Sequence, residues 1–138
     1  MKFNSQICTT REQSERLLSL GLKKETADMC SVIDHVSDGG KWEEVDTIFS
    51  FTPDDWNFRQ SVTPRWSLHR LLCLIPKEIE LSFGKWVCIN INYDYNIIYL
   101  NDNQDDFVGF YEGSIYNKAI DCIEWLIKEG YFNKECLI

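Results

Sequence analysis

Residues 79–113 constrain the fold more than any other segment, because they hold four short runs of strand-forming residues with polar turns between them. The runs are rich in β-branched and aromatic residues and read "IELSF", "KWVCININY", "NIIYLN" and "DFVGFYEG". Gly84 and the segments "DYN" and "NDNQDD" separate them, and these residue types are typical of tight turns. Connections this short join neighbouring antiparallel strands, so the segment predicts an antiparallel β-meander.

A helix is predicted on each side of this meander, near the two ends of the chain. In the first helix, Thr9 stands three residues before Glu12, which is the spacing of a capping box, and Gly21 marks the end. The second helix begins after Ser114 and ends at Gly130, and its apolar residues recur at helical spacing. A meander packed against N- and C-terminal helices belongs to the α+β fold class.

The segment "TPRWSLHRLLCLIP", residues 63–76, predicts a short middle helix. Ser67 is a preferred N-cap residue, and Pro76 ends the helix because proline cannot continue the backbone hydrogen bonds. A nucleophilic role for Ser67 has little support, since no G-x-S-x-G turn surrounds it. We therefore expect a structural role, with Trp66 buried at the entry to the helix and an apolar stripe behind it: Leu68, Leu71, Leu72 and Ile75.

The whole chain, residues 1–138, is predicted to form a single α+β domain. Its 138 residues lie within the usual size of one domain, and 44% hydrophobic with 14% aromatic residues suits a globular protein. Residues 23–63 carry the weakest pattern, with one strand-like alternation at 45–51 and an irregular aromatic loop after it. No internal repeat or low-complexity segment divides the sequence.

The charge of the chain argues against binding to nucleic acid or to anionic membranes. Its 22 acidic residues outnumber its 14 basic residues, for a formal net charge of -8 that is spread along the sequence. Since Lys and Arg supply most of the affinity for phosphates, no non-specific nucleic-acid binding is expected. No run is long and apolar enough for a signal peptide or a membrane span, so a cytoplasmic protein is expected. The six cysteines form no C-x-x-C pair and would stay thiols in a reducing compartment.

Three segments carry recognisable motifs in order: "TTREQSERLLSLGLKKETADM", "PRWSLHRLLCLIP" and "AIDCIEWLIKEGYF". The first follows the pattern T-x-E-Q-S-x-x-L-L-x-L-G-L-x-x-x-T-A-D-M, and the second follows P-x-W-S-L-x-x-L-L-x-L-I-P. In these motifs and their spacing the chain resembles a family of uncharacterised small proteins carried by prophages and integrative elements of gut Bacteroidales and Firmicutes. The resemblance implies a mobile-element protein and supplies no catalytic residues.

His69 and Cys73 are the strongest chemical signal in the sequence. They are four residues apart, which on a helix places them on one face at a spacing that suits two metal ligands or a Cys/His dyad. A zinc site needs two more ligands, and the only other histidine is His35. We therefore expect no metal and no other cofactor, with His69 facing solvent beside a half-buried Cys73.

A segment after the third strand-like run partly follows the pattern of a calcium-binding loop. Asn101, Asn103 and Asp105 occupy its alternate ligand positions, and Glu112 stands at the twelfth. The sixth position is Asp106 where such a loop needs Gly, and the preceding run reads as a strand where a helix is required. A solvated hairpin loop is the favoured interpretation.

Aromatic side chains outside the patterned elements are the best candidates for a binding surface. Core packing is the default explanation for the five tryptophans and for the tyrosines of "NYDYNIIY". Trp42 and Trp56, however, lie in polar, turn-like surroundings where a large ring is harder to bury. These two residues therefore predict a partner-binding surface.

The sequence predicts a non-enzymatic protein-interaction module of a mobile genetic element. It would bind a protein partner, or a second copy of itself as a homodimer, through the aromatic surface. One alternative is a small metal-dependent or Cys/His enzyme that uses His69 and Cys73. Another is an acidic inhibitor that competes for the basic site of a nucleic-acid-binding protein, which would form a salt-sensitive complex.

Overall fold

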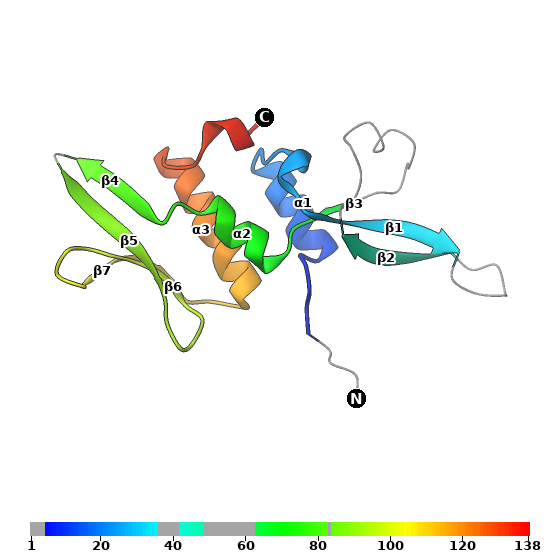
Figure 1. Ribbon diagram of the computed structural model, residues 1–138, viewed down its shortest axis with the longest axis horizontal. Coiled ribbons are helices and arrows are strands. Elements are labelled where there is room, and N and C mark those ends of the chain that lie inside the picture. The colour runs from blue at the N-terminus through cyan, green and yellow to red at the C-terminus, as the bar shows by residue number, and fades with distance from the viewer. Residues whose placement is uncertain (1–4, 36–41, 49–62, 83) are drawn as a thin grey trace. The chain divides into compact units, whose positions relative to one another are not determined.

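The protein combines helices with two antiparallel sheets, one of which is a meander. This confirms the predicted α+β class and the short middle helix. The computed structural model describes residues 5–35, 42–48, 63–82 and 84–138, with the backbone alone at 32–35 and 42–48 (Figure 1).

The chain separates into two compact units. The first comprises Met1–Arg70 with Cys136–Ile138, and the second is Leu71–Glu135. Helix α2 (Leu68–Leu74) begins in the first unit and ends in the second. That residues 1–138 behave as one domain stays a prediction.

The first unit is a three-stranded antiparallel sheet with a helix on its short edge strand. The strand order is β2-β1-β3, and helix α1 packs on β3. Met29 of β1 aligns with Ile48 of β2 on one side and with Arg65 of β3 on the other. The elements are α1 (Arg11–Ser19), the 3-10 helix η1 (Lys24–Thr26), β1 (Met29–His35), β2 (Trp42–Ile48) and β3 (Thr63–Arg65).

Strands β1 and β2 lie in the part of the sequence where the pattern is weakest. The alternation at 45–51 correctly indicates a strand, but β2 begins earlier, at Trp42. Residues 49–51 of the predicted strand lie outside the described residues. Strand β1 has no counterpart in the sequence prediction, because its "MCSVIDH" lacks a clear alternation of apolar and polar residues.

The predicted capping box that starts at Thr9 is wrong by one residue. Thr10 is the N-cap of α1: its hydroxyl accepts the N–H of Gln13 at 3.2 Å, and the Gln13 side chain accepts the Thr10 N–H at 2.9 Å. Thr9 is buried, and its hydroxyl instead accepts the N–H of Trp66 at 3.0 Å. The predicted end of the helix is correct, since Gly21 follows the last turn with a φ of 97°.

Trp66 joins separate segments of the first unit, and its side chain is fully buried. Besides the bond to the Thr9 hydroxyl, the Trp66 carbonyl accepts the Thr9 N–H at 2.9 Å, and the indole N–H donates to the Thr26 hydroxyl at 3.0 Å. Buried Arg65 donates to the Thr9 carbonyl at 3.0 Å and to the Ser31 hydroxyl at 3.3 Å. These bonds satisfy polar groups whose burial would otherwise be costly.

Ser67 is the N-cap of α2, as predicted, and it also ties the helix to the start of β1. Its hydroxyl oxygen accepts the N–H of Arg70 at 3.1 Å. The same hydroxyl donates to one carboxylate oxygen of Asp28 at 2.5 Å, and the Ser67 N–H donates to the other at 2.8 Å. Because both hydrogen-bonding roles of the hydroxyl are used, Ser67 serves the structure.

The second unit is a four-stranded antiparallel meander with a long helix packed on β6 and β7. Helix α3 begins where predicted, because the Ser114 hydroxyl accepts the N–H of Asn117 at 3.2 Å, and it ends at Gly130 with a φ of 80°. The elements are β4 (Glu78–Ser82), β5 (Lys85–Ile91), β6 (Ile97–Leu100), β7 (Asp106–Phe110) and α3 (Ile115–Glu129). A 3-10 helix, η3 (Lys134–Cys136), follows them.

Trp125 of α3 is the centre of an aromatic cluster against the sheet. Its ring centroid lies 6.1 Å from that of Tyr99, 6.2 Å from Phe110 and 5.7 Å from Tyr131. Tyr99 is fully buried, and its hydroxyl donates to the carbonyl of Pro76 at 2.6 Å. The cluster therefore fixes which face of the meander packs on the helix.

The contacts of Trp66, Ser67 and His69 predict an order of destabilisation. Trp66→Ala should lower the free energy of unfolding by about 3–5 kcal/mol, because it removes a buried ring. Ser67→Ala should cost about 0.5–2 kcal/mol through loss of the cap. His69→Ala should change it by less than about 0.5 kcal/mol, because His69 is exposed. Urea unfolding followed by circular dichroism measures the free energy of unfolding of all three variants. If His69→Ala lowered it more than the other two substitutions, the structural role of this segment would be contradicted.

Cys122 predicts how the stability depends on pH. It is fully buried on α3, and burial, with a smaller contribution from the charge of Asp121, raises the pKa of its thiol to about 12. In the unfolded chain the thiol ionises near pH 8.5, so at higher pH the unfolded chain loses a proton that the folded chain keeps. Stability is therefore lost as pH rises from about 8.5 toward 12.

Urea unfolding under reducing conditions tests this expectation with Cys122→Ala as the reference. Between about pH 7 and about pH 10, the wild-type chain should lose about 2 kcal/mol more free energy of unfolding than the variant does. An equal loss in both proteins would show that the thiol does not cause the pH dependence.

Candidate functional site

The two tryptophans predicted to bind a partner are not placed by the structure. Trp42 begins β2, and its backbone pairs with that of His35, but its side chain lies outside the described part of the protein. Trp56 falls entirely outside the described residues. Their role stays a prediction, and the exposed aromatic side chains that the structure does describe lie in the second unit.

His69 and Cys73 both lie on α2, and both are exposed. The expectation for His69 is therefore correct, whereas Cys73 is more open to solvent than the half-buried position expected. Among the residues that the structure describes, no group of three or more His, Cys, Asp and Glu side chains could hold a metal ion. The predicted pair thus has no third ligand within the described ranges.

The segment compared with a calcium loop is the turn of the β6–β7 hairpin. The side-chain oxygen of Asn101 accepts the backbone N–H groups of Asn103 and Asp105, each at 3.0 Å. The backbone closes the turn, because the Asn101 N–H donates to the Asp105 carbonyl at 2.9 Å. The Asn101 oxygen therefore serves its own turn, which confirms the hairpin interpretation.

The β5–β6 hairpin has the same turn and presents two tyrosines at its tip. The side-chain oxygen of Asn92 accepts the N–H groups of Asp94 and Asn96, each at 3.0 Å. Tyr93 is 102% exposed relative to a free residue, and Tyr95 is 66% exposed. We call residues 92–96 the tyrosine hairpin.

Tyr95 of the tyrosine hairpin has a φ of 59°, a left-handed conformation that Gly or Asn adopts at lower cost. Gln104 at the matching position of the β6–β7 turn is also left-handed, with a φ of 63°, so what distinguishes the tyrosine hairpin is an aromatic residue at that position and a contact from α3. Lys118 of α3 is 6% exposed, and its ammonium group donates to the Asp94 carbonyl at 3.1 Å. A buried lysine thus holds the tip that displays two exposed rings.

One face of the meander is covered by α3, and no other described element of the unit lies on the opposite face (Figure 1). Tyr99, which contacts Trp125, is aligned with Ile89 on the covered side. Side chains alternate along a strand, so the next aligned pair, Cys88 with Leu100, points to the uncovered side. We call this side the open face; by the same alternation it carries Ile98, which is buried, and seven residues that are at least partly exposed: Glu78, Glu80, Trp86, Cys88, Asn90, Leu100 and Asp106.

Tyr111 lies over the end of the open face. A methyl group on Gly109 would clash with the Tyr111 hydroxyl oxygen, so only glycine lets the ring lie there. The hydroxyl donates to the Asp106 carboxylate at 2.8 Å, and this hydrogen bond raises the pKa of Tyr111 above its ordinary value. The ring is half exposed and held in place.

A depression of about 220 Å³ lies where the open face meets the β6–β7 turn. Its apolar wall includes Leu100, and the thiol-bearing residue Cys88 lines it from β5. Polar groups come from four other residues, Asn90, Asn101, Asp102 and Gln104. Asp102 is the one charged side chain among the described residues that line it.

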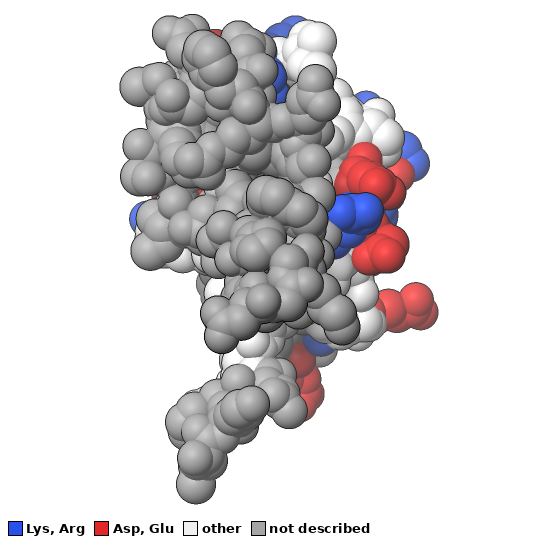
Figure 2. Space-filling view, turned by 90° about the vertical axis from the view of Figure 1, so that its right-hand side faces the viewer, with Lys and Arg blue, Asp and Glu red and all other residues white. Residues whose placement is uncertain are grey.

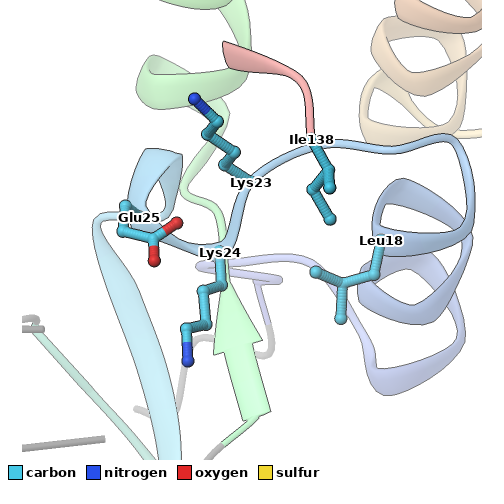
Figure 3. Close-up of a pocket in the computed structure, with 5 residues that line it drawn as sticks. All are labelled: Leu18, Lys23, Lys24, Glu25 and Ile138. Atoms are coloured by element: carbon cyan, nitrogen blue, oxygen red, sulfur yellow. The ribbon is translucent and has the colours of Figure 1, made fainter. Parts of the chain in front are cut away.

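A second cavity, of about 630 Å³, lies in the first unit and is shown in Figure 3. Figure 3 shows the side chains of Leu18 and Ile138 turned toward one another, while Lys23 and Lys24 extend away in different directions. The two lysine amines therefore do not converge on one ligand in this cavity.

The charged strand residues of the open face are all acidic. Figure 2 shows a different side of the molecule, the right-hand side of the view in Figure 1, where acidic and basic side chains lie next to one another in the part that is not grey. On the open face, by contrast, the charged strand residues are Glu78, Glu80 and Asp106, and no lysine or arginine of β4–β7 alternates onto it. The open face is therefore acidic as well as aromatic.

No family model matches the chain, and neither a curated protein nor a solved structure is significantly similar to it. In the described ranges, no helix has both the length and the apolar composition that crossing a membrane requires. The site must therefore be interpreted from its own chemistry.

Proposed function

We propose that the chain is a non-enzymatic protein-interaction module and that its tyrosine hairpin contacts the partner. The observation that carries the proposal is Tyr95, an exposed aromatic residue held in a left-handed backbone conformation. A left-handed tyrosine costs more stability than Gly or Asn would at this position, and most of its surface stays in solvent, so its presence favours a role outside the fold. Tyrosine is enriched at the energetic centres of protein interfaces.

The support for the hairpin matches what an interface requires. Binding is tighter when the contact residues are already held in the bound conformation, because less ordering entropy is lost. Asn92 fixes the turn through two backbone N–H groups, and Lys118 holds the carbonyl of Asp94 from α3. The two tyrosines therefore lie on a loop whose conformation these hydrogen bonds hold.

The geometry gives less support to an enzyme built on His69 and Cys73. Both side chains are exposed on one helix, and among the described residues no group of three or more His, Cys, Asp and Glu side chains could hold a metal ion beside them. We therefore favour an interaction protein of the mobile-element family that its motifs resemble. A reducing cytoplasm would keep its exposed Cys73 and Cys88 as thiols.

The double substitution Tyr93→Ser with Tyr95→Asn tests the proposal. Asn tolerates the left-handed conformation at position 95, so the variant should be at least as stable as the wild-type chain in urea. Its affinity for the protein captured from host lysate by the wild-type chain should fall by about tenfold or more, because two exposed interface rings are lost. Surface plasmon resonance with the purified partner measures this.

Ile7→Ser is the matched control, since Ile7 is an exposed apolar residue of the first unit, 59% exposed. It should leave the affinity unchanged. Equal affinities of the tyrosine variant and the wild-type chain would contradict a contact through the hairpin. Turnover of a small molecule that depends on Cys73, with no protein captured, would favour the enzyme alternative instead.

A further inference from the structure

We infer that the open face binds a basic segment of a partner protein, with a lysine or arginine side chain in the depression beside Asp102. The inference rests on the proposed function, because it names the chemistry of the partner that the interaction module would bind. It is carried by a different surface from the tyrosine hairpin, so each can fail without the other.

The size of the depression indicates a single side chain. At about 220 Å³ it is smaller than the roughly 300–1,000 Å³ that pockets for whole small molecules occupy. It opens on a sheet face, where an extended or helical segment of another protein can lie and insert one residue. The depression therefore suits an anchor residue of a protein.

The polar groups of the depression indicate a cation. Asp102 provides a carboxylate, and Asn90 and Gln104 each provide an amide oxygen that accepts hydrogen bonds. Asn101 also lines the depression, but its side-chain oxygen already accepts two backbone N–H groups. Lysine has three donors and arginine five, and both carry apolar stems that can lie along Leu100.

The surrounding face adds attraction of the same sign. Glu78, Glu80 and Asp106 share the open face with the depression, and no basic residue of β4–β7 alternates onto it to neutralise them. Trp86, two residues before Cys88 on β5, is 44% exposed and offers an aromatic ring to a cation or to an aliphatic stem. Such complementarity favours a basic partner and disfavours nucleic acid.

A synthetic peptide tests this chemistry before the partner is known. The probe is a capped peptide of alternating arginine and leucine, about ten residues long, and the reference is the same peptide with citrulline, which keeps the shape and lacks the charge. Fluorescence anisotropy at physiological salt should show binding of the arginine peptide and at least about tenfold weaker binding of the citrulline peptide.

Asp102→Asn should weaken binding of the arginine peptide by about tenfold, because it removes the charged acceptor of the depression. Glu129→Gln makes the same change of net charge at an exposed position at the end of α3, and it should change the affinity by less than about twofold. Equal weakening by both substitutions would overturn the inference, since it would show attraction to the net charge alone.

Alkylation of the two exposed cysteines locates the bound peptide. Cys88 lines the depression, whereas Cys73 lies on α2. Saturating arginine peptide should slow the reaction of Cys88 with a maleimide by about tenfold and leave Cys73 unchanged. An unchanged rate of reaction of Cys88 with the maleimide would overturn the inference. Protection of Cys88 as the concentration of the protein itself rises would also overturn it, because that result would make the open face an interface between copies.

These outcomes are separate from those of the proposed function. If the Asp102→Asn variant still binds the captured partner while the tyrosine variant does not, the proposed interaction module is supported and the inferred binding of a basic segment is wrong. If the arginine peptide protects Cys88 but the tyrosine variant keeps full affinity for the captured partner, the open face binds and the role of the hairpin fails.

Discussion

The contact between Thr9 and Trp66 is the interaction on which the first unit depends. It joins residues 57 positions apart, and the entropy lost in closing so long a stretch of chain must be offset by what the contact buries. The indole ring is fully buried and its N–H is satisfied by Thr26, so the contact combines apolar burial with paired polar groups. This contact positions three elements: the start of α1, the edge strand β3 and the N-terminus of α2.

This dependence explains why a segment rich in reactive side chains is structural. The Ser67 hydroxyl accepts a hydrogen bond from the first turn of α2 and donates one to Asp28. The Arg65 side chain donates to Thr9 and Ser31. Side chains engaged in this way cannot be changed for a catalytic purpose without loosening the fold. We propose that partner binding uses instead the exposed residues of the second unit, such as the two tyrosines of the tyrosine hairpin.

Local signals explain which parts of the structure could be predicted. Ser114 and Gly130 bound α3 by cap chemistry that involves near neighbours, and the meander follows from short turns, so both were visible in the sequence. The choice of Thr10 over Thr9 as the cap depends on Trp66, far along the chain, and could not be read locally. Strand β1 likewise forms through pairing with β2 and β3.

The candidate site was harder to predict because exposure is a tertiary property. The tyrosines of "NYDYNIIY" looked like core residues, and only the turn geometry shows that Tyr93 and Tyr95 stand in solvent while Tyr99 is buried. The acidic character of the open face depends on which side chains of each strand point away from α3, and this requires knowing the face on which α3 packs. A signal was present in the repeated Asn at the start of each turn, Asn92 and Asn101.

We propose that the second unit displays the binding surface, while the segment around Trp66 holds the first unit together. Hydrogen exchange followed by mass spectrometry, on the chain alone and bound to its captured partner, tests this claim most directly. We predict that the partner slows hydrogen exchange at residues 92–96 and 101–106. Residues 63–67 should exchange slowly, and at the same rate, in the free and the bound protein. Protection confined to α1, α2 and the 63–67 segment, with the two hairpin turns unaffected, would contradict the account.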